Sequence, residues 1–369
     1  MHHPRPLPSA LLAGALLALA GCGTTHLVKS PTPTPTAIAT PTGTPVPTPV
    51  PTPAPLNAPV LIQVENLYQA RPQSGLSTAA VVYEYDTEGG ISRFTGIWYT
   101  LPPTADLVGP VRSARLIDLR LLRIYGGALL YSGASNYTLA QLRQSGLPQY
   151  SPDSAVVGST VLYRLSSRSA PPSLYGAPHN LYTNGSVLAT FDQKVALPEV
   201  AYQLWTRTAI AALPAGGTAV TSFKVPVSQS ETPIFTYDPT NQAYQRSEPG
   251  GGGYPATGTL NDADTNAPWE TPNVVVLQAP VITVAADNEN SANVPWTDGL
   301  DFGIGPSASG TGQLAVGGQL YAINWTQGAS GPPQLTLADG QPAPLVAGQV
   351  LFEVVGTGAT VTVEATPAA

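Results

Sequence analysis

The chain has 369 residues, of which 10% are charged and about a fifth are glycine or proline, a composition typical of a loop-rich and strand-rich protein. The formal net charge of -7 is uneven, with nine arginines against seven acidic residues in 57–190 and four basic against fifteen acidic residues in 191–369. Neither half offers the strongly basic face that nucleic-acid phosphates require, which excludes a nucleic-acid partner.

The first 21 residues have the pattern of a bacterial export signal. Arg5 precedes an apolar run at 10–20, which is too short to span a bilayer. The run ends in the sequence LAGC, which resembles the lipobox of bacterial lipoproteins and contains Cys22, the one cysteine of the chain. We predict a lipoprotein signal peptide over 1–21. Acyl chains on Cys22, palmitate among them, would anchor the protein in the outer leaflet of the cell membrane, on its extracytoplasmic face. An ordinary signal peptide with an incidental cysteine is the alternative.

Residues 22–56 are predicted to form a linker that is rich in proline and threonine. Proline makes up ten of the 26 residues at 30–55. Such a tract has no apolar core to bury and favours polyproline II, so at about 3.1 Å per residue it reaches about 80 Å. We expect a disordered or semi-rigid stalk, and both alternatives place the folded part in the wall zone.

The folded part begins near residue 57 with strands that alternate with helices. Apolar and alternating runs predict strands at 59–65, 80–86, 91–100 and 128–132. Ser113 can cap a helix over 114–125, and a second helix over 137–144 is followed by Gly146. This alternation predicts an α/β (α+β) N-terminal domain over 57–195.

The pattern changes in the second half of the chain. One or two helices are expected within 186–212, and residues 196–219 are predicted as a bridging segment. From 220 to 364 a second, mostly β, domain is expected, because short alternating runs separated by turn signals recur at 221–227, 233–237, 242–246, 273–284, 313–326 and 349–364. Because the halves differ in pattern and charge, we expect two separate cores that meet near 191–220.

The sequence has no recognisable set of metal ligands or cofactor-binding motif, and we predict neither a metal nor a cofactor. His179 is the one histidine of the folded part, which excludes the usual multi-histidine metal sites. Asp262, Asp264 and Asn266 occupy the first ligand offsets of an EF-hand loop. The glycine and the glutamate that such a loop needs at its sixth and twelfth positions are missing, so we interpret this segment as a polar turn.

Arg112 and Arg115 stand at the predicted start of the first helix. Cations are unfavourable there because the helix dipole is positive at that end, so an anionic group should lie beside them. That group could be Glu84, Asp86 or Glu88 of the preceding hairpin, or it could be a ligand, and the two can coexist.

Several segments of the chain resemble one known family, the YerB-like bacterial lipoproteins, which are also described as domain of unknown function 3048. The N-terminal half is similar to that family's N-terminal domain in the segments "ARPQSGLSTAAVVYE" (70–84), "EGGISRF" (88–94), "GPVRSAR" (109–115), "YSGAS" (131–135) and "APHNLYT" (177–183). The second half resembles the family's C-terminal domain more loosely, in the segments "FTYDPTNQAYQR" (235–246), "NVVVLQAPV" (273–281), "GQLAVGGQLYAINW" (312–325) and "LADGQPAPLVAGQVLFEVV" (337–355).

The resemblance implies a two-domain, membrane-anchored extracytoplasmic protein, and it carries over no catalytic residue. The family commonly has a histidine in the stretch matched here by 131–133, where this chain has Ser132. A chemistry that needs two histidines is therefore in doubt for this chain.

His179 follows a proline, which favours an extended approach into a loop. Structural hydrogen bonding, ligand binding and general acid–base catalysis all remain open for it. We expect His179 to lie close to Arg112 and Arg115, with Glu84 or Glu88 within pairing distance. The candidate binding or catalytic residues, most of them in the family-like segments, are Arg71, Glu84, Glu88, Arg93, Arg112, Ser113, Arg115, Arg168, His179 and Asn180.

Two hypotheses on function follow from these residues. The first is a lipoprotein whose N-terminal domain binds an anionic cell-wall component, such as a peptide-stem carboxylate or a polymer phosphate, or an envelope partner protein. The alternative is a cell-wall glycan or peptide hydrolase or lyase that uses Glu84 or Glu88 with His179 as acid and base. The absence of any hydrolase motif favours the first.

Overall fold

The computed structural model describes residues 56–99, 107–152, 161–165, 179–250, 255–287 and 299–364. The predicted signal peptide, Cys22, nearly all of the predicted linker and Arg168 lie outside these ranges. In the ranges described, no helix has both the length and the apolar character needed to cross a membrane.

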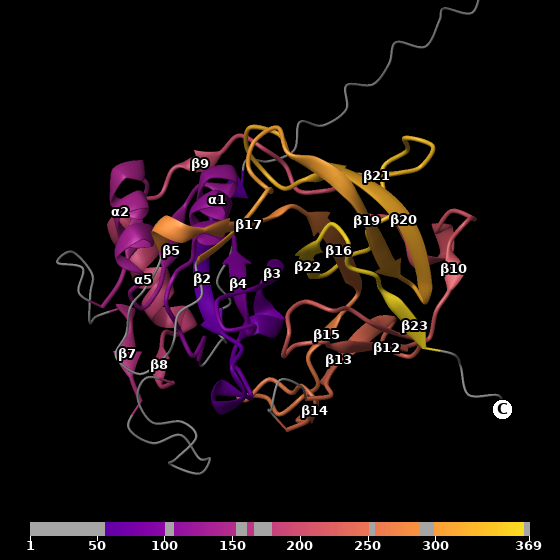
Figure 1. Cartoon of the computed structure of the whole chain (residues 1–369), viewed down its shortest axis with the longest axis horizontal. Coiled ribbons are helices and arrows are strands. Elements are labelled where there is room, and N and C mark those ends of the chain that lie inside the picture. The colour runs from indigo at the N-terminus through magenta and orange to yellow at the C-terminus, as the bar shows by residue number, and fades with distance from the viewer. Residues whose placement is uncertain are drawn as a thin grey trace, which may run out of the picture. The chain divides into compact units, whose positions relative to one another are not determined.

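The N-terminal half combines sheet and helices, as the sequence predicts (Figure 1). Its main strands are β2 (Val60–Glu65), β3 (Val81–Asp86), β4 (Ser92–Trp98), β5 (Ala128–Leu130) and β6 (Gln149–Tyr150). Its helices are α1 (Leu116–Tyr125), α2 (Asn136–Ser145) and α5 (Gly185–Val195), with one-turn 3-10 helices η1 (Tyr68–Ala70) and η2 (Leu76–Thr78). Two short pairs complete it, β1 (Leu56–Asn57) with β9 (Glu199–Val200) and β7 (Tyr163–Arg164) with β8 (Leu181–Tyr182).

The start of α1 differs from the prediction that Ser113 caps it. The N-cap residue is Arg115, whose backbone N–H donates to Oδ2 of Asp118 at 2.7 Å. The hydroxyl of Ser113 instead donates to the carbonyl oxygen of Ser132 at 3.1 Å. A carboxylate three residues inside the helix thus binds the N-cap N–H group, which is half of a capping box.

The C-terminal half is mostly β, as predicted. Its strands are β10 (Thr218–Ala219), β11 (Ser222–Lys224), β12 (Ile234–Asp238), β13 (Ala243–Glu248), β14 (Gly258–Thr259), β15 (Glu270–Thr271), β16 (Asn273–Ala279), β17 (Val281–Val284), β18 (Gly299–Phe302), β19 (Ser309–Val316), β20 (Gln319–Thr326), β21 (Gln334–Leu337), β22 (Val350–Gly356) and β23 (Thr362–Glu364). The short 3-10 helices η3 (Ile210–Ala212) and η4 (Ala285–Asp287) interrupt them. Between the halves one α-helix, α5, overlaps 186–212, and the chain after β9 forms no helix or strand before η3.

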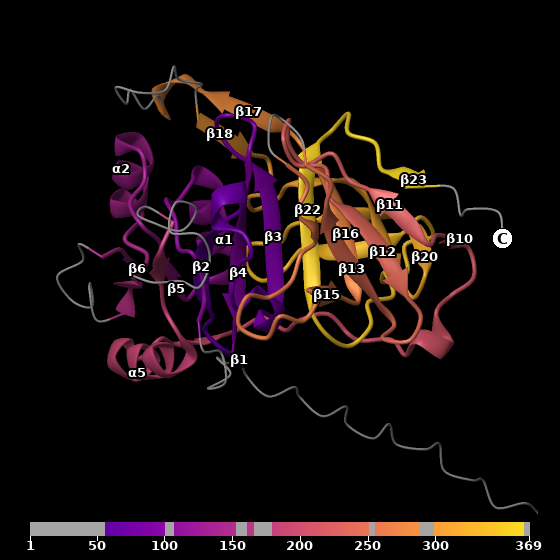
Figure 2. The ribbon, with the colours of Figure 1, turned by 90° about the horizontal axis from the view of Figure 1, so that it is seen from below.

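One sheet passes through both halves of the chain. Its order is β10-β20-β19-β16-β22-β3-β4-β2-β5-β6, with β21 paired to β20. The junction is β22, which runs parallel to β16 on one side and to β3 on the other, so that β3 and β22 lie side by side (Figure 2). A second sheet, β14-β13-β12-β11-β23 with β15 on β13, has six strands.

The hydrophobic residues divide by sheet face and not by half of the chain. One cluster joins Leu61 and Ile117 of the N-terminal half to Phe352 of the C-terminal half, on the face that α1 covers. The other joins Ile62 to Phe235 and Tyr244, between the large sheet and the six-stranded sheet. The expectation of two separate cores is therefore wrong, because the two domains complete one sheet and share both of its buried faces.

Candidate functional site

Side chains of β2 and β4 alternate between the two faces of the large sheet. Val64 and Phe94 belong to the cluster that faces the six-stranded sheet. Their neighbours Glu65 and Arg93 therefore point to the opposite face, on which α1 lies. Glu65 and Arg93 are register partners across the two strands. The strands thus place an acid and a cation side by side at their ends.

Glu65 holds both His179 and Arg112. Its Oε2 lies 2.8 Å from Nδ1 of His179, and its Oε1 accepts a hydrogen bond from Nε of Arg112 at 3.0 Å. The side chain of Glu65 is 2% exposed, whereas those of His179 and Arg112 are 18% and 22% exposed. One buried carboxylate therefore orients two side chains that remain partly open to solvent.

The contact with Glu65 also fixes the tautomer of His179. An ionised carboxylate has no hydrogen to donate, so the proton of this hydrogen bond lies on Nδ1 of the ring. In the neutral imidazole the other nitrogen, Nε2, is then a hydrogen-bond acceptor. If Nε2 takes up a proton, the ring becomes a cation that Glu65 compensates.

A second ion pair lies at the start of α1. Nε of Arg115 is 2.5 Å from Oε2 of Glu88, which belongs to the turn between β3 and β4, and both side chains are more than four-fifths buried. The carboxylate compensates a cation that stands at the positive end of the helix dipole. Of the acids that the sequence offers as partners of Arg112 and Arg115, Glu88 is the one that pairs.

Arg93 couples the two ion pairs. It is 5% exposed, and its Nη1 donates to the carbonyl oxygen of Ser113 at 2.8 Å. Its Nε is buried and has no hydrogen-bond partner in the part of the chain that the structure describes. Burial and then the nearby positive charge of Arg115 lower the pKa of Arg93 to about 9, and the other members of both ion pairs contribute less. Arg93 is thus a buried cation at neutral pH without a carboxylate of its own among the described residues.

These side chains form one site, which we call the arginine cluster. It comprises Glu65, Glu88, Arg93, Arg112, Arg115 and His179. Within these six side chains three guanidiniums face two carboxylates, and the buried carboxyl group of Asp118 borders them at the backbone N–H of Arg115. Ser132 borders the cluster, because its backbone N–H donates to the carbonyl oxygen of Arg112 at 2.8 Å.

Asn180, a neighbour of His179, has a structural part in the β7–β8 pair. Its Oδ1 accepts a hydrogen bond from Nη1 of Arg164 at 2.9 Å, and its Nδ2 donates to the carbonyl oxygen of Leu165 at 2.8 Å. These contacts fix the chain immediately after His179. Asn180 therefore helps to position the imidazole without joining the arginine cluster.

Glu84 belongs to a different site, on the other face of the sheet. It is fully buried, and its Oε2 lies 2.6 Å from Nη1 of Arg246. Its Oε1 accepts hydrogen bonds from Nδ2 of Asn66 at 3.0 Å and from the hydroxyl of Ser92 at 2.5 Å. The prediction that Glu84 could pair with Arg112 or Arg115 is therefore wrong, because the backbone of β3 separates them.

Arg71 lies with Glu84 and not with His179. Its Nη2 is 2.5 Å from Oε2 of Glu231, and its Nε donates to Oδ1 of Asn66 at 3.1 Å. Six side chains, each at most 4% exposed, form this buried ionic network: Arg71, Glu84, Glu231, Arg246, Glu248 and Glu353. It connects β3 and β22 of the large sheet to β13 of the six-stranded sheet.

The network holds four carboxyl groups against two guanidiniums. Burial, and then the adjacent Glu84, raise the pKa of Glu353 well above its ordinary value. Burial, and then Glu248, raise the pKa of Glu231 to about 8. Burial disfavours ionisation of Glu248 as well, but Arg246 and Arg71 outweigh it and lower the pKa of that group. With Glu231 and Glu353 protonated, the charges of the network balance.

The segment with Asp262 and Asp264 is a turn whose carboxylates bind protein groups. Oδ2 of Asp262 accepts hydrogen bonds from the backbone N–H of Gly75 and the hydroxyl of Ser77, both at 2.8 Å, and Oδ1 of Asp264 accepts one from the hydroxyl of Ser74 at 3.0 Å. The turn thus fastens the C-terminal half to the 74–77 loop. Across the described ranges, no three or more His, Cys, Asp or Glu side chains are grouped so that they could hold a metal ion.

The sequence prediction omits Glu65 and Arg246, which organise the two sites. Glu65 ends a strand whose other residues, except Gln63, are apolar. A carboxylate in such a strand needs a partner when it is buried, which is a signal that could have indicated it. No comparable signal exists for Arg246, because an alternating strand with an exposed face also accommodates arginine.

Comparisons with known proteins agree with this fold. The sequence profile "Protein of unknown function (DUF3048) N-terminal domain" matches residues 44–196, and the DUF3048 C-terminal domain matches 223–351. The chain is 27% identical over 306 residues to "Putative lipoprotein YerB" of Bacillus subtilis (strain 168), which covers 80% of this chain and 81% of that protein. The crystal structure of YerB from Bacillus subtilis has a similar fold, with a TM-score of 0.63 at 22% identity over 83% of this chain and 94% of that one. The chain therefore belongs to the YerB-like family that the DUF3048 N- and C-terminal domains define.

Proposed function

We propose that the arginine cluster binds an anionic group of the bacterial cell envelope. The observation that supports this most directly is the imbalance of charge around Arg93, a buried cation with an unpartnered Nε and no carboxylate of its own among the described residues. A carboxylate or phosphate at the cluster would receive charge-assisted hydrogen bonds from guanidinium groups, whose fork matches both anions. The peptide stem of the wall and phosphate-containing wall polymers carry such groups, and an acidic segment of an envelope protein is a further source.

We also propose that the protein is anchored to the membrane through Cys22, on the extracytoplasmic face. The lipobox-like sequence that ends in Cys22 supports this, as does the name of the Bacillus subtilis relative. Acylation at this cysteine would place the folded part within reach of the wall. Cell fractionation of the Cys22→Ala variant tests the anchor, and normal processing with retention in the membrane fraction would contradict it.

The binding proposal is tested with the mature protein in non-ionic detergent. Titration calorimetry with two soluble probes, a wall peptide with a free carboxylate and a glycerol phosphate polymer, distinguishes the two kinds of anion. Arg112→Ala should weaken binding by roughly ten- to a hundredfold, because a hydrogen bond to a charged group contributes about 1.5–3 kcal/mol. Binding should also weaken as the salt concentration rises.

The matched control is Arg123→Ala, which removes an exposed arginine from the same helix. Its affinity for both probes should equal that of the parent. Thermal melts of each variant separate binding from folding. If Arg112→Ala lowers the melting temperature but leaves the affinity for both probes unchanged, the cluster is structural and the proposal fails.

One observation favours the catalytic alternative, with a different acid than the sequence suggests. Glu65, and not Glu84 or Glu88, orients His179 and leaves Nε2 as an acceptor, which is the arrangement of a general base. Mass spectrometry of the wall peptide, and of wall glycan, after incubation tests it in the same samples. Cleavage that His179→Gln abolishes would support catalysis, whereas intact fragments with the parent protein would leave binding as the function.

A further inference from the structure

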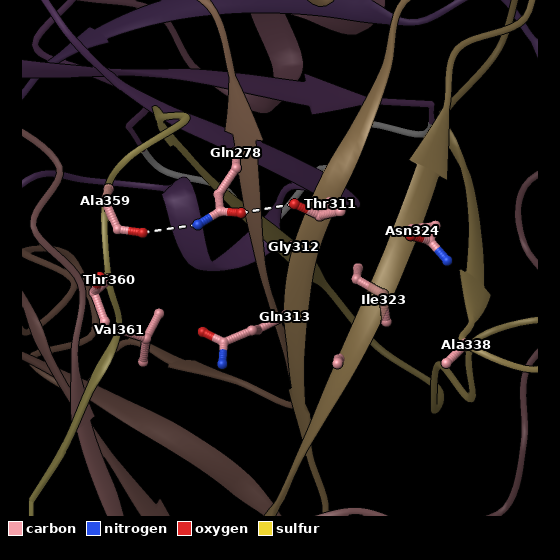
Figure 3. Close-up of a pocket in the computed structure, with 11 residues that line it drawn as sticks. Gln278, Thr311, Gly312, Gln313, Ile323, Asn324, Ala338, Ala359, Thr360 and Val361 are labelled. Atoms are coloured by element: carbon pink, nitrogen blue, oxygen red, sulfur yellow. Dashed lines mark hydrogen bonds between the residues drawn. The ribbon is translucent and has the colours of Figure 1, made fainter.

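A groove lies over the outward face of β19 and β20, away from the arginine cluster. Its volume is about 350 Å³, and we call it the amide groove (Figure 3). Gln313 of β19 and Asn324 of β20 line it, and we call their side chains its rim. Ala322 of β20 is the register partner of Gln313, and we call it the floor. The 359–361 segment and Ala338 form its two sides. It lies on the same sheet face as the buried ionic network, because Ala315 and Leu320, at alternate positions to Gln313 and Ala322, belong to the cluster on that face.

The hollow exists because Ala322 is small. Ala322 is the register partner of Gln313, and Thr311 is the register partner of Asn324. In a strand these side chains stand on one face at alternate positions. Larger residues at 311, 313 and 324 surround a methyl group at 322, so the sheet surface is lower there than around it.

One wall of the groove is held in place by hydrogen bonds. Nε2 of Gln278 donates to the carbonyl oxygen of Ala359 at 2.8 Å, and the hydroxyl of Thr311 donates to Oε1 of Gln278 at 2.8 Å (Figure 3). These bonds tie the segment after β22 to the sheet. The groove is therefore preformed, and the amide of Gln278 is already used within the protein.

The amides of Gln313 and Asn324, in contrast, have no hydrogen-bond partner among the described residues. Each offers two N–H donors and one carbonyl acceptor to the groove. Between them the floor and sides present methyl groups, from Ala322, Ala338 and Val361. The groove thus combines neutral polar groups at its rim with an apolar floor.

None of the residues that line the groove is charged. The outward residues of β19, β20 and β21 are all neutral: Ser309, Thr311, Gln313, Ala322, Asn324, Thr326, Gln334 and Thr336. A charged ligand would lose hydration in the groove without meeting an opposite charge, which disfavours it. A ligand rich in hydroxyl and amide groups would replace its hydrogen bonds to water with hydrogen bonds to the free amides, at little cost in free energy.

We propose that the amide groove binds an uncharged glycan whose pyranose rings carry acetamido groups. The methyl of an acetamido group would lie over Ala322, and its N–H and carbonyl would meet the amides of Gln313 and Asn324. The ring hydroxyls would complete the hydrogen bonds at the rim. This proposal is independent of anion binding at the arginine cluster, because it rests on other residues and another chemistry.

The test uses the full mature protein in non-ionic detergent, with the tetramer of N-acetylglucosamine as the probe and cellotetraose as its counterpart without acetamido groups. Titration calorimetry should show binding of the first and at least about tenfold weaker binding of the second. Ala322→Leu fills the hollow at an exposed position and should weaken binding of the N-acetylglucosamine tetramer at least about tenfold. Asn324→Ala, which removes one rim amide, should weaken it as well.

The control is Gln334→Ala, an exposed amide on the same sheet face outside the groove, which should leave the affinity unchanged. Thermal melts should show that all three variants are folded. The proposal is overturned if the parent does not bind the tetramer up to about 10 mM, a level at which even weak sites fill. It is also overturned if Ala322→Leu binds as well as the parent, or if cellotetraose binds equally well.

Discussion

Glu84 and Glu353 lie directly opposite each other across β3 and β22, and both are fully buried. Two adjacent carboxyl groups in such a place cannot both be ionised unless cations compensate them. Arg246 contacts both, with Nη1 at 2.6 Å from Glu84 and 2.8 Å from Glu353. The same guanidinium also contacts Glu248, so one cation serves three carboxyl groups. Burial, and then Glu84, raise the pKa of Glu353 well above its ordinary value.

The buried ionic network has fewer guanidiniums than carboxyl groups, and this predicts how the free energy of unfolding depends on pH. Glu231 is the group that tests the prediction. Folded Glu231 has a pKa of about 8 against an ordinary value of 4.5, because burial and Glu248 disfavour its ionisation. Unfolding between these two values releases a proton, so the free energy of unfolding falls as the pH rises. Glu231→Gln removes this effect while its amide oxygen can still accept from Arg71. From pH 5 to 8 the variant should therefore gain stability relative to the parent, by up to about 1.4 kcal/mol per pH unit.

Chemical denaturation at each pH measures this difference. Glu199→Gln, at an exposed position, is the control, and its offset from the parent should stay constant with pH. If the difference in free energy of unfolding between Glu231→Gln and the parent also stays constant from pH 5 to 8, Glu231 is ionised in the folded protein and the prediction fails.

For single residues, the sequence predicts that a charged side chain needs a partner better than it predicts which residue that partner is. The need of Arg115 for an anion follows from its place at a helix start, and Glu88 meets that need. Glu84 and Glu88 are close in sequence, but only the packing of distant elements decides that Glu84 faces away from α1. Glu65 and His179 meet across more than a hundred residues, and a single sequence gives no indication of such a pair.

Among the elements, the hairpin of β17 and β18 joins the C-terminal half to two helices of the N-terminal half. Arg120 of α1 forms an ion pair with Asp301 of β18, which raises the pKa of that arginine. Asp287, in η4 directly after β17, accepts hydrogen bonds from the hydroxyls of Ser135 and Thr138 at the start of α2. A carboxylate there also meets the positive end of the helix dipole.

We expect Asp287→Ala to release this hairpin from α2. Asp287 as a whole is 3% exposed, so removal of its carboxylate leaves the hydroxyls of Ser135 and Thr138 without their buried acceptor. Hydrogen exchange should accelerate in 281–287, in 299–302 and in the first turn of α2, since local opening becomes easier. Exchange in β3 and β22 should not change.

The comparison variant is Asp339→Ala, which alters an exposed turn. It should leave exchange in the hairpin as in the parent. Acceleration that spreads equally through the large sheet in Asp287→Ala would mean that the whole fold is weakened and that the hairpin does not open by itself.

Long periodic elements are the ones that the sequence predicts well. The strands that fall in the expected runs all have alternation or apolar residues over several positions: β2, β3, β4, β5, β11, β12, β13, β16, β17, β19, β20, β22 and β23. The four-residue strands β18 and β21 were not expected. The two-residue strands were not expected either, because a pair of residues carries no period: β1, β6, β7, β8, β9, β10, β14 and β15. The start of α1 was misplaced because Ser113 and Asp118 both offer an oxygen for the cap, and only the backbone path before Arg115 decides between them.

The whole folded part is expected to unfold as one unit. β22 belongs to the C-terminal domain, yet it pairs with β3 over five residues and both hydrophobic clusters contain residues of both domains. Separation of the domains would expose the edge of β3 and the full buried ionic network to water. Neither domain can therefore lose its structure while the other keeps its core.

Calorimetry of the mature protein should show a single transition whose calorimetric and van't Hoff enthalpies agree. The pieces 57–200 and 215–369, expressed separately, should lack a cooperative melt. In the first piece β3 would lack its neighbour β22, and in the second piece β22 would lack β3. Two resolved transitions in the intact chain, or a cooperative melt of either piece, would contradict this expectation.

The position of β22 between β16 and β3 also has a consequence for biogenesis. β3 ends at Asp86, and the strand that must lie beside it begins only at Val350. A ribosome that adds roughly 5–20 residues per second needs on the order of tens of seconds to supply that strand after β3 has been made. During this interval the nascent chain cannot complete its large sheet, and one edge of β3 stays open. A transcript truncated before the codon for Val350 would yield a polypeptide with a permanently open strand edge, which favours aggregation.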